Sequence, residues 1–269
     1  MRLKNSLKHK WSIVTGADSG IGLEFARELA RMESDLVIIS NRVEPLEKTA
    51  RTLSEAFNVE VKDFCVDLCT ENAATLILKF LEDNYIRPYI FINNAGIFSF
   101  DFVTSTSPAK INCFVDLHVR AVTVLSREIA LLMQQNGEGR ILNMSSMSCW
   151  MPMPGIALYS ATKAYIRVFS RALYYEMHDS GVSVTVACPG GIATDLFGLP
   201  SNLQKLAVKL RVLQKPEDFA RKAVSKMLKG KKQYINGWLN RLYIFFVAIT
   251  PDRVRLLIKR RMLDRNIRR

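Results

Sequence analysis

Residues 11–22 read Trp11-Ser12-Ile13-Val14-Thr15-Gly16-Ala17-Asp18-Ser19-Gly20-Ile21-Gly22, a short apolar run followed directly by three spaced glycines. The run 11–15 has the length and β-branched content of a buried strand, and an amphipathic pattern over 22–32 predicts a helix. A tight turn from strand to helix needs residues without a Cβ atom, so that backbone N–H groups and the helix N-terminus can approach an anion. The stretch therefore predicts a phosphate-binding turn.

The alternation of strand and helix continues along the chain. Further β-branched apolar runs lie at 36–39, 59–66, 89–92, 140–143 and 182–187, and helical patterns lie at 44–57, 71–84, 111–135, 158–179 and 216–229. Strands that are apolar on both faces, with helix-length segments between them, indicate a parallel sheet covered by helices on both sides. We expect an α/β fold with a single doubly wound Rossmann-type domain of about seven parallel strands, which bind ligands at their carboxyl ends.

The charge of the chain is concentrated near its C-terminus. Residues 200–269 carry 19 Lys/Arg and 4 Asp/Glu, a net charge of +15, whereas residues 1–199 carry 19 Lys/Arg and 21 Asp/Glu, a net charge of −2. We expect a Rossmann-type domain over 1–235 and an apolar and basic extension over 236–269 that packs on the domain, on a partner or on a membrane surface. A basic segment of this kind can contact nucleic acid, anionic lipid or only water.

The five cysteines, at positions 65, 69, 113, 149 and 188, are odd in number and lack the spacing of a zinc site. No apolar segment typical of a signal peptide follows the basic start of the chain, and no apolar run reaches the ~18 residues of a membrane span. An apolar content of 49% excludes a disordered chain. We expect a cytoplasmic protein in a reducing environment, without a bound metal.

The residues that follow the second predicted strand discriminate between two nucleotide cofactors. A carboxylate there holds a ribose 2′-hydroxyl, whereas an arginine accommodates a 2′-phosphate. The chain has Ser40-Asn41-Arg42 at this point, without a carboxylate. Arg42 therefore favours NADP(H) over NAD(H), although it could also be a solvated residue at the start of a helix.

Tyr159 and Lys163 stand four residues apart in a predicted helix and are neighbours on one of its faces. An ammonium group lowers the pKa of a nearby phenol from about 10 toward neutral pH, as general acid–base catalysis requires. The same spacing is common on helix surfaces. The pair indicates catalysis only together with the motifs around it.

Four motifs occur in a fixed order, and they are glycines 16, 20 and 22, Asn93-Asn94-Ala95-Gly96, Tyr159 with Lys163, and Pro189-Gly190 through Thr194. In these motifs the chain, over about residues 8–235, resembles the short-chain dehydrogenase/reductase family, and within it ketoreductases that act on lipid-like carbonyls. The resemblance implies an NADP(H)-dependent catalytic domain that interconverts a carbonyl and an alcohol. It implies catalytic roles for Tyr159, Lys163 and Ser146.

The resemblance also implies which residues hold the cofactor. Asn94 would line the cofactor cleft, Asp67 would meet the adenine, Lys163 would hold ribose hydroxyls and Thr194 would hold the carboxamide. The complete expected set is Gly16, Asp18, Ser19, Gly20, Ile21, Gly22, Arg42, Asp67, Leu68, Asn94, Ala95, Gly96, Tyr159, Lys163, Pro189, Gly190, Ile192 and Thr194.

The chain has two adjacent serines at one expected catalytic position and a histidine at another. The family separation selects Ser146 to hold the substrate oxygen, and because side chains alternate at a strand end we expect Ser145 to face the other side of the sheet. Where related chains commonly have a catalytic Asn, this chain has His118. The imidazole either replaces that Asn in a proton relay or is an inert, hydrogen-bonded helix residue.

Three apolar segments bear on substrate and partners. The Met-rich loop 147–158 and the segment 196–213 indicate either a pocket for a hydrophobic carbonyl or alcohol, of the 3-oxoacyl lipid, 3-ketosphinganine or steroid type, or ordinary core and subunit packing. The aromatic segment 238–250, which a basic end follows, is too short to span a membrane. It could lie in an anionic membrane interface, in peripheral contact through 238–269, or pack against a partner subunit.

We expect a homo-oligomer, either a dimer or a tetramer, and no nucleic-acid partner. The alternative function is a non-catalytic NADP(H)-binding regulatory or nucleic-acid-binding protein that uses the basic C-terminal region.

Overall fold

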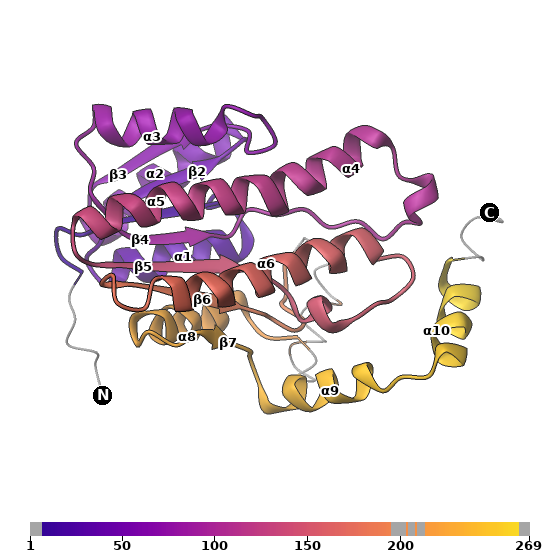
Figure 1. Cartoon of the computed structure of the whole chain (residues 1–269). Helices are drawn as coiled ribbons and strands as arrows, with labels where there is room; N and C mark the ends of the chain where they lie inside the picture. Colours follow the sequence, from indigo (N-terminus) through magenta and orange to yellow (C-terminus); the bar gives the residue numbers. More distant parts are fainter. Residues whose placement is uncertain (1–6, 195–202, 204–207, 209–212, 264–269) are drawn as a thin grey trace.

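A parallel sheet of seven strands forms the centre of the molecule (Figure 1). The computed structural model describes residues 7–194, 203, 208 and 213–263. The strands are β1 (Trp11–Thr15), β2 (Asp35–Ser40), β3 (Val61–Cys65), β4 (Pro88–Asn93), β5 (Gly139–Met144), β6 (Val182–Ala187) and β7 (Gln233–Tyr234). Each of the six strand ranges expected from the sequence falls on one of them, and β7 adds a short edge of two residues.

The order of the strands across the sheet is β3-β2-β1-β4-β5-β6-β7, and every neighbouring pair is parallel. The chain moves outward from β1 to β3 and then returns to the other side of β1 to form β4. The direction of winding therefore reverses between β1 and β4. In a doubly wound sheet a crevice opens at the carboxyl ends of the strands at this point, where ligands bind.

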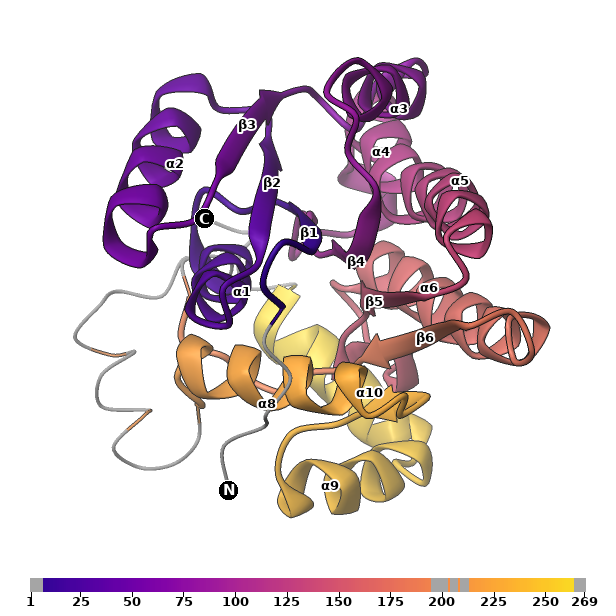
Figure 2. The same ribbon diagram turned by 90° about the vertical axis from the view of Figure 1, so that its left-hand side faces the viewer.

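Helices cover both faces of the sheet (Figure 2). Those on one face, α1 (Gly20–Arg31), α2 (Val43–Phe57) and α8 (Pro216–Leu228), bury side chains such as Phe25, Leu46 and Phe219. Those on the other face, α3 (Ala73–Asp83), α5 (Val122–Gln135) and α6 (Ala157–Glu176), enclose a second apolar layer that includes Ile77, Leu125 and Ile129. Each helix buries one apolar stripe, as its sequence pattern indicates, and the predicted α/β fold is confirmed.

The single helix expected over 111–135 is a composite. It consists of α4 (Pro108–Val115), a π-helical turn at Asp116–Ala121 and then α5. Ser107 caps its N-terminus by accepting a hydrogen bond from the Lys110 N–H at 3.3 Å. The π turn widens the helix where His118 lies, and such turns are frequent at functional sites.

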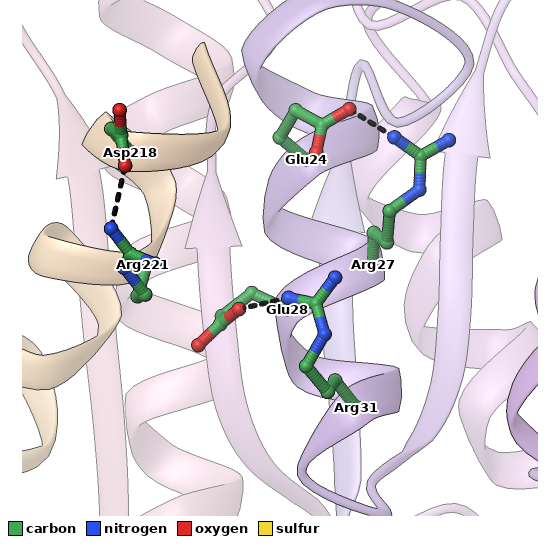
Figure 3. A network of polar contacts seen from close by, with 6 residues as sticks. All are labelled: Glu24, Arg27, Glu28, Arg31, Asp218 and Arg221. Carbon is green, nitrogen blue, oxygen red and sulfur yellow. Dashed lines mark hydrogen bonds and ion pairs between the residues drawn. The ribbon is translucent and has the colours of Figure 1, made fainter. Parts of the chain in front are cut away.

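Helices α1 and α8 carry ion pairs between side chains three residues apart (Figure 3). Glu24 pairs with Arg27 and Glu28 with Arg31 on α1, and Asp218 pairs with Arg221 on α8. Surface pairs of this kind contribute only ~0–1 kcal/mol each. The two helices are held together mainly by the buried apolar side chains between them, among them the rings of Phe25 and Phe219, which meet edge to face.

Beyond β7 the chain leaves the layered domain. It forms α9 (Trp238–Ala248), α10 (Asp252–Ile258) and a π-helical turn at Lys259–Leu263, which extend along one side of the molecule (Figure 1). Among the described helices none is long and apolar enough to cross a bilayer. The other apolar segment expected to bear on the substrate, 196–213, lies largely outside the described residues.

Candidate active site

The turn between β1 and α1 has a backbone that only glycine accommodates. Gly16 and Gly20 have positive φ angles of +63° and +56°, and a Cβ atom on Gly22 would overlap the carbonyl oxygen of Gly16. Because α1 begins at Gly20, its first N–H groups have no intrahelical acceptor and remain available to an anion. This is the geometry of a phosphate-binding turn.

The segment at the end of β4 is hydrogen-bonded to this turn. Thr15 Oγ1 accepts the N–H groups of Asn94 at 2.9 Å and Ala95 at 3.0 Å, and Asn94 Nδ2 donates to the Thr15 carbonyl oxygen at 3.0 Å. A Cβ atom on Gly96 would lie only 3.0 Å from Nε2 of His118 and 3.3 Å from Nζ of Lys163. The four-residue motif thus joins the glycine turn to the side chains of His118 and Lys163.

A cleft of about 470 Å³ opens where the winding of the sheet reverses. Most of the expected cofactor residues line it, namely Gly16, Asp18, Ser19, Gly20, Ile21, Gly22, Arg42, Asp67, Leu68, Asn94, Ala95, Gly96, Tyr159, Lys163, Pro189 and Thr194. Segments far apart in the sequence therefore converge on one elongated cleft, as a dinucleotide requires.

Gly190 and Ile192 are expected cofactor residues that do not belong to the lining of this cleft. The Gly190 N–H donates to Asn236 Oδ1 at 2.7 Å, and a Cβ atom on Gly190 would overlap the Asn240 side chain of α9. Ile192 is buried and forms an isolated bridge with Gln214. The structure places both residues in the packing beneath the C-terminal extension.

Arg42 lies at the mouth of the cleft, beside the glycine turn. Its Nε donates to Asp18 Oδ2 at 2.5 Å and its guanidinium donates to Ser19 Oγ at 2.9 Å. The side chain of Arg42 is 53% exposed, whereas that of Asp18 is 4% exposed. Asp18 therefore holds a solvent-accessible guanidinium across the cleft, and β2 ends at Ser40 without a carboxylate.

Tyr159 and Lys163 project from the first turns of α6 into the cleft and are both almost fully buried. Lys163 Nζ donates to the Met144 carbonyl oxygen at 3.0 Å and lies 5.7 Å from the centre of the Tyr159 ring. The Phe98 ring meets Tyr159 edge to face at 5.0 Å. Both functional groups are thus held in place by backbone and ring contacts.

The pKa of Tyr159 departs from the sequence expectation. We expected the ammonium of Lys163 to lower it, but burial raises the pKa of Tyr159 to about 12, and the hydrogen bond from Ser146 offsets this only in part. Burial also lowers the pKa of Lys163 to about 8. The expectation was wrong because helix spacing predicts proximity but carries no information about desolvation, which is the largest influence on the pKa of Tyr159.

The two adjacent serines do not lie on opposite sides of the sheet, as strand alternation predicted. Ser145 Oγ donates to the Lys163 carbonyl oxygen at 2.7 Å, and Ser146 hydrogen-bonds to Tyr159, so both meet α6. The alternation fails because β5 ends at Met144 and Ser146 already caps a 3₁₀ turn. The two serines differ in what they contact: Ser145 is hydrogen-bonded to the backbone of α6, whereas Ser146 lies at the Tyr159 phenol.

His118 is completely buried in the π turn beside these groups. Its Nε2 accepts the Ile97 N–H at 3.1 Å, so its proton lies on Nδ1, which is 3.0 Å from Thr162 Oγ1. Burial holds the pKa of the imidazole well below its usual 6.5, and the charge of Lys163 lowers it further. The imidazole is therefore neutral and ties the end of the β4 loop to α6.

The sequence of residues 10–202 matches the family model described as short chain dehydrogenase. The chain belongs to this family. The match spans the glycine turn, the β4 motif and the Tyr159–Lys163 pair, which are the elements that meet in the cleft.

Vertebrate proteins are among the relatives of this short-chain dehydrogenase. It is 34% identical to hydroxysteroid dehydrogenase-like protein 1 of Gallus gallus over 69% of the chain and 56% of that protein. The Homo sapiens protein named inactive hydroxysteroid dehydrogenase-like protein 1 is 30% identical, over 90% of the chain and 73% of that protein. Very-long-chain 3-oxoacyl-CoA reductase-A of Danio rerio is 33% identical, over 70% of the chain and 59% of that protein. The chain thus spans little more than half of the chicken and zebrafish proteins.

A solved structure shares the arrangement. L-sorbose reductase from Gluconobacter frateurii, in complex with NADPH and L-sorbose, superposes with a TM-score of 0.77 at 26% identity, over 86% of this chain and 95% of that chain. The short-chain dehydrogenase fold of this chain therefore extends over nearly the whole of a structure that binds a nicotinamide cofactor.

Some residues of the cleft were not anticipated from the sequence. Cys69 and Cys113 both line it and are joined by a disulfide, although 44 residues separate them and no pairing was expected. The loop after β3 and helix α4 bring them together. Phe98, which meets the Tyr159 ring, was also missed, although an aromatic residue two positions after the Asn-Asn-Ala-Gly motif was a signal that could have found it. No cluster of His, Cys, Asp and Glu suited to a metal ion occurs among the described residues.

Proposed function

We propose that this short-chain dehydrogenase is an NADP(H)-dependent oxidoreductase that interconverts a carbonyl and a secondary alcohol. One observation carries the proposal: α6 buries Tyr159 and Lys163 in the same cleft that begins at the glycine turn. The Ser146 hydroxyl lies near the Tyr159 phenol and lowers its pKa, so the two hydroxyl groups are neighbours. A substrate oxygen placed there meets both.

The side chains divide the proton chemistry among them. The nicotinamide, when bound, exchanges a hydride with the substrate carbon. In reduction, Tyr159 donates its phenolic proton to the carbonyl oxygen, and the Ser146 hydroxyl donates a hydrogen bond to the same oxygen. The pKa of about 12 keeps Tyr159 protonated, as a proton donor requires. Lys163, in its ammonium form, stabilises the phenolate that remains.

The proposed choice of NADP(H) rests on Arg42. Its exposed guanidinium, oriented by Asp18, lies beside the glycine turn at the end of the cleft that a nucleotide ribose would occupy. A guanidinium binds a phosphate through charge-assisted hydrogen bonds, and no carboxylate is present at the end of β2 to hold a 2′-hydroxyl instead.

A hydrophobic substrate fits the surroundings of Tyr159. A small hollow next to it is lined by the apolar side chains of Val103, Phe114, Ile156 and Leu158, together with the polar side chains of Ser99, Asp101 and Thr106. The relatives named very-long-chain 3-oxoacyl-CoA reductase support the same class of substrate. We propose a carbonyl of the 3-oxoacyl lipid, 3-ketosphinganine or steroid type. In a series of 3-oxoacyl substrates we expect kcat/KM to rise with acyl length, and a steady fall with length would contradict this substrate class.

Substitution of Tyr159 tests the activity itself. Tyr159→Phe should lower kcat by about 10²–10⁴-fold, because a general acid is lost, while NADPH binding is retained. Oxidation of NADPH is measured by absorbance against steroids, 3-oxoacyl esters and 3-ketosphinganine, and NADPH binding by fluorescence. Tyr165→Phe is the matched control, since Tyr165 lies on the same helix but is exposed and bonds to Thr123. Equal turnover by Tyr159→Phe and wild type would refute the assignment.

The relative named inactive favours one alternative, a protein that binds NADP(H) without turnover. The buried Tyr159 and Lys163, with the half-buried Ser146 beside them, argue against it, because a chain that had lost catalysis would have no need to keep a lysine at 5% exposure. Tight NADPH binding without turnover of any compound in the panel would support this alternative. We further propose a homo-oligomer, to be tested by light scattering.

A further inference from the structure

Helix α9 contacts the domain with only a narrow stripe. Asn240, Ile244 and Val247 are its partly or fully buried residues among those whose side chains are described, and they recur at helical spacing on one face. The side chains on the rest of the helix are large, apolar and exposed, and they are Trp238 (72% exposed), Leu239 (58%), Leu242 (45%), Tyr243 (53%), Phe245 (61%), Phe246 (53%) and, just after the helix, Ile249 (60%). The helix thus presents its broader apolar face outward.

Helix α10 continues this surface. Arg255 of α10 joins the two helices by donating to the Val247 carbonyl oxygen of α9 at 3.4 Å, and it also donates to Asp252 Oδ1 within α10 at 3.0 Å. Val254, Leu256 and Leu257 on α10 are exposed as well. Nearly half of the exposed large hydrophobic residues in the described part of the chain therefore belong to this one short segment, which we call the C-terminal arm (238–261). So large an apolar patch marks a contact surface.

Positive charge surrounds the apolar side chains of the C-terminal arm. Residues 238–269 contain nine Lys/Arg and two Asp/Glu, a net charge of +7. Arg241, Arg253, Arg260 and Arg261 are exposed, and none of them is in a salt bridge between described residues. A surface that matches the arm in chemistry therefore has an apolar interior and negative charges at its boundary.

The C-terminal arm contacts the loop that follows β4. Lys259 stands over the Phe102 ring, 5.8 Å from its centre, in the loop that follows β4. Val103, the next residue of that loop, lines the hollow beside Tyr159. A surface bound by the arm would consequently meet the molecule near the entrance for the substrate.

We propose that the C-terminal arm docks this protein on an anionic lipid bilayer. Aromatic and aliphatic side chains with a cationic rim match the boundary between headgroups and acyl chains of such a bilayer. A second copy of the chain fits less well, because a twofold contact would bring two identical positive segments together. If the proposed function is right, the docked enzyme would take its lipid-like substrate directly from the bilayer; the docking itself does not depend on that activity.

Co-sedimentation of the full chain with vesicles tests the proposal. We expect binding to phosphatidylcholine–phosphatidylglycerol vesicles, weak binding to phosphatidylcholine alone, and loss of binding at high salt. Arg260→Glu with Arg261→Glu should weaken binding about tenfold or more, because both charges are reversed. Lys222→Glu with Lys226→Glu is the matched control, since these exposed lysines lie on α8 and are not part of the arm. It should bind as wild type does.

The apolar part of the C-terminal arm is tested separately. Phe245→Ser with Phe246→Ser should also weaken vesicle binding about tenfold or more, whereas Val43→Ser with Tyr85→Ser, which removes exposed apolar side chains elsewhere, should not. NADPH binding by each variant shows that it is folded. Absence of vesicle binding by wild type, or equal loss in arm and control variants, overturns the proposal. The proposal is also overturned if the wild type does not bind vesicles but forms a dimer that only the arm variants dissociate. The arm would then be a subunit interface.

Discussion

His118 offers the sharpest test of the site. Its burial makes the free energy of unfolding depend on pH, and this dependence would differ if the imidazole took up a proton in the folded protein. The imidazole has no exposed surface, and burial and the charge of Lys163 hold its pKa well below 6.5. Below pH ~6.5 the unfolded chain binds a proton at this residue that the folded chain does not bind. The free energy of unfolding therefore falls as the pH decreases through this range, by up to ~1.4 kcal/mol per pH unit from this one group.

The substitution His118→Asn removes that dependence. At neutral pH the variant should be less stable by ~1–3 kcal/mol, because the N–H of Ile97 and the hydroxyl of Thr162 lose well-placed partners. As the pH falls below ~6.5 the wild type loses stability faster, so the two free energies of unfolding should converge. Urea unfolding of both proteins across this pH range measures the difference between their free energies of unfolding. The contributions of the other titratable groups cancel in that difference. His178→Asn is the control, since His178 lies in an exposed turn.

Parallel pH dependence of wild type and His118→Asn would refute this reasoning. It would mean that the imidazole is protonated in the folded protein, with access to water that the structure does not give it. The same variant also separates the two interpretations of His118 in catalysis. A neutral imidazole that only positions the β4 loop and α6 leaves the shape of the pH–rate profile unchanged in His118→Asn, even where kcat falls. A shifted profile would instead assign His118 to the proton relay.

The cleft supports three more predictions. Arg42→Ala should raise the Kd for NADPH about tenfold or more, since a charge-assisted hydrogen bond contributes ~1.5–3 kcal/mol, and should leave the Kd for NADH unchanged. Fluorescence titration measures both constants, and an equal loss of affinity for the two cofactors contradicts recognition of a 2′-phosphate. Gly22→Ala should abolish NADPH binding in calorimetry, because its Cβ overlaps the Gly16 carbonyl oxygen; retained affinity contradicts a rigid turn. For reduction, kcat/KM should fall as pH rises through about 8, where Lys163 loses its proton; a flat profile removes the need for an ammonium.

Much of this molecule could be predicted from local patterns. The runs of β-branched residues fall on the six long strands, and the glycines at 16, 20 and 22 stand where the backbone tolerates no Cβ atom. Strand and helix periodicity are properties of a few consecutive residues, and the glycine turn is defined by its own backbone. Both were therefore accessible without knowledge of the rest of the chain.

Other features depend on parts of the chain that are distant in sequence. The pairing of Cys69 with Cys113 and the contact of Gly190 with α9 arise only when separate segments pack together. Ser145 was predicted on the wrong side of the sheet because β5 ends at Met144, directly before it, and the end of the strand depends on where it finds a hydrogen-bonding partner. The position of α9, with its apolar face outward, is likewise set by which of its faces meets the domain.

The sequence by itself determined the α/β fold and the phosphate-binding turn, because both are encoded by spacing along the chain, and its family resemblance indicated most of the side chains that meet in the cleft. Only the tertiary structure decided their electrostatic state. Burial raises the pKa of Tyr159 to about 12, lowers that of Lys163 to about 8 and keeps His118 neutral. The physical reason is that desolvation depends on everything packed around a group, and that environment is assembled from the whole fold.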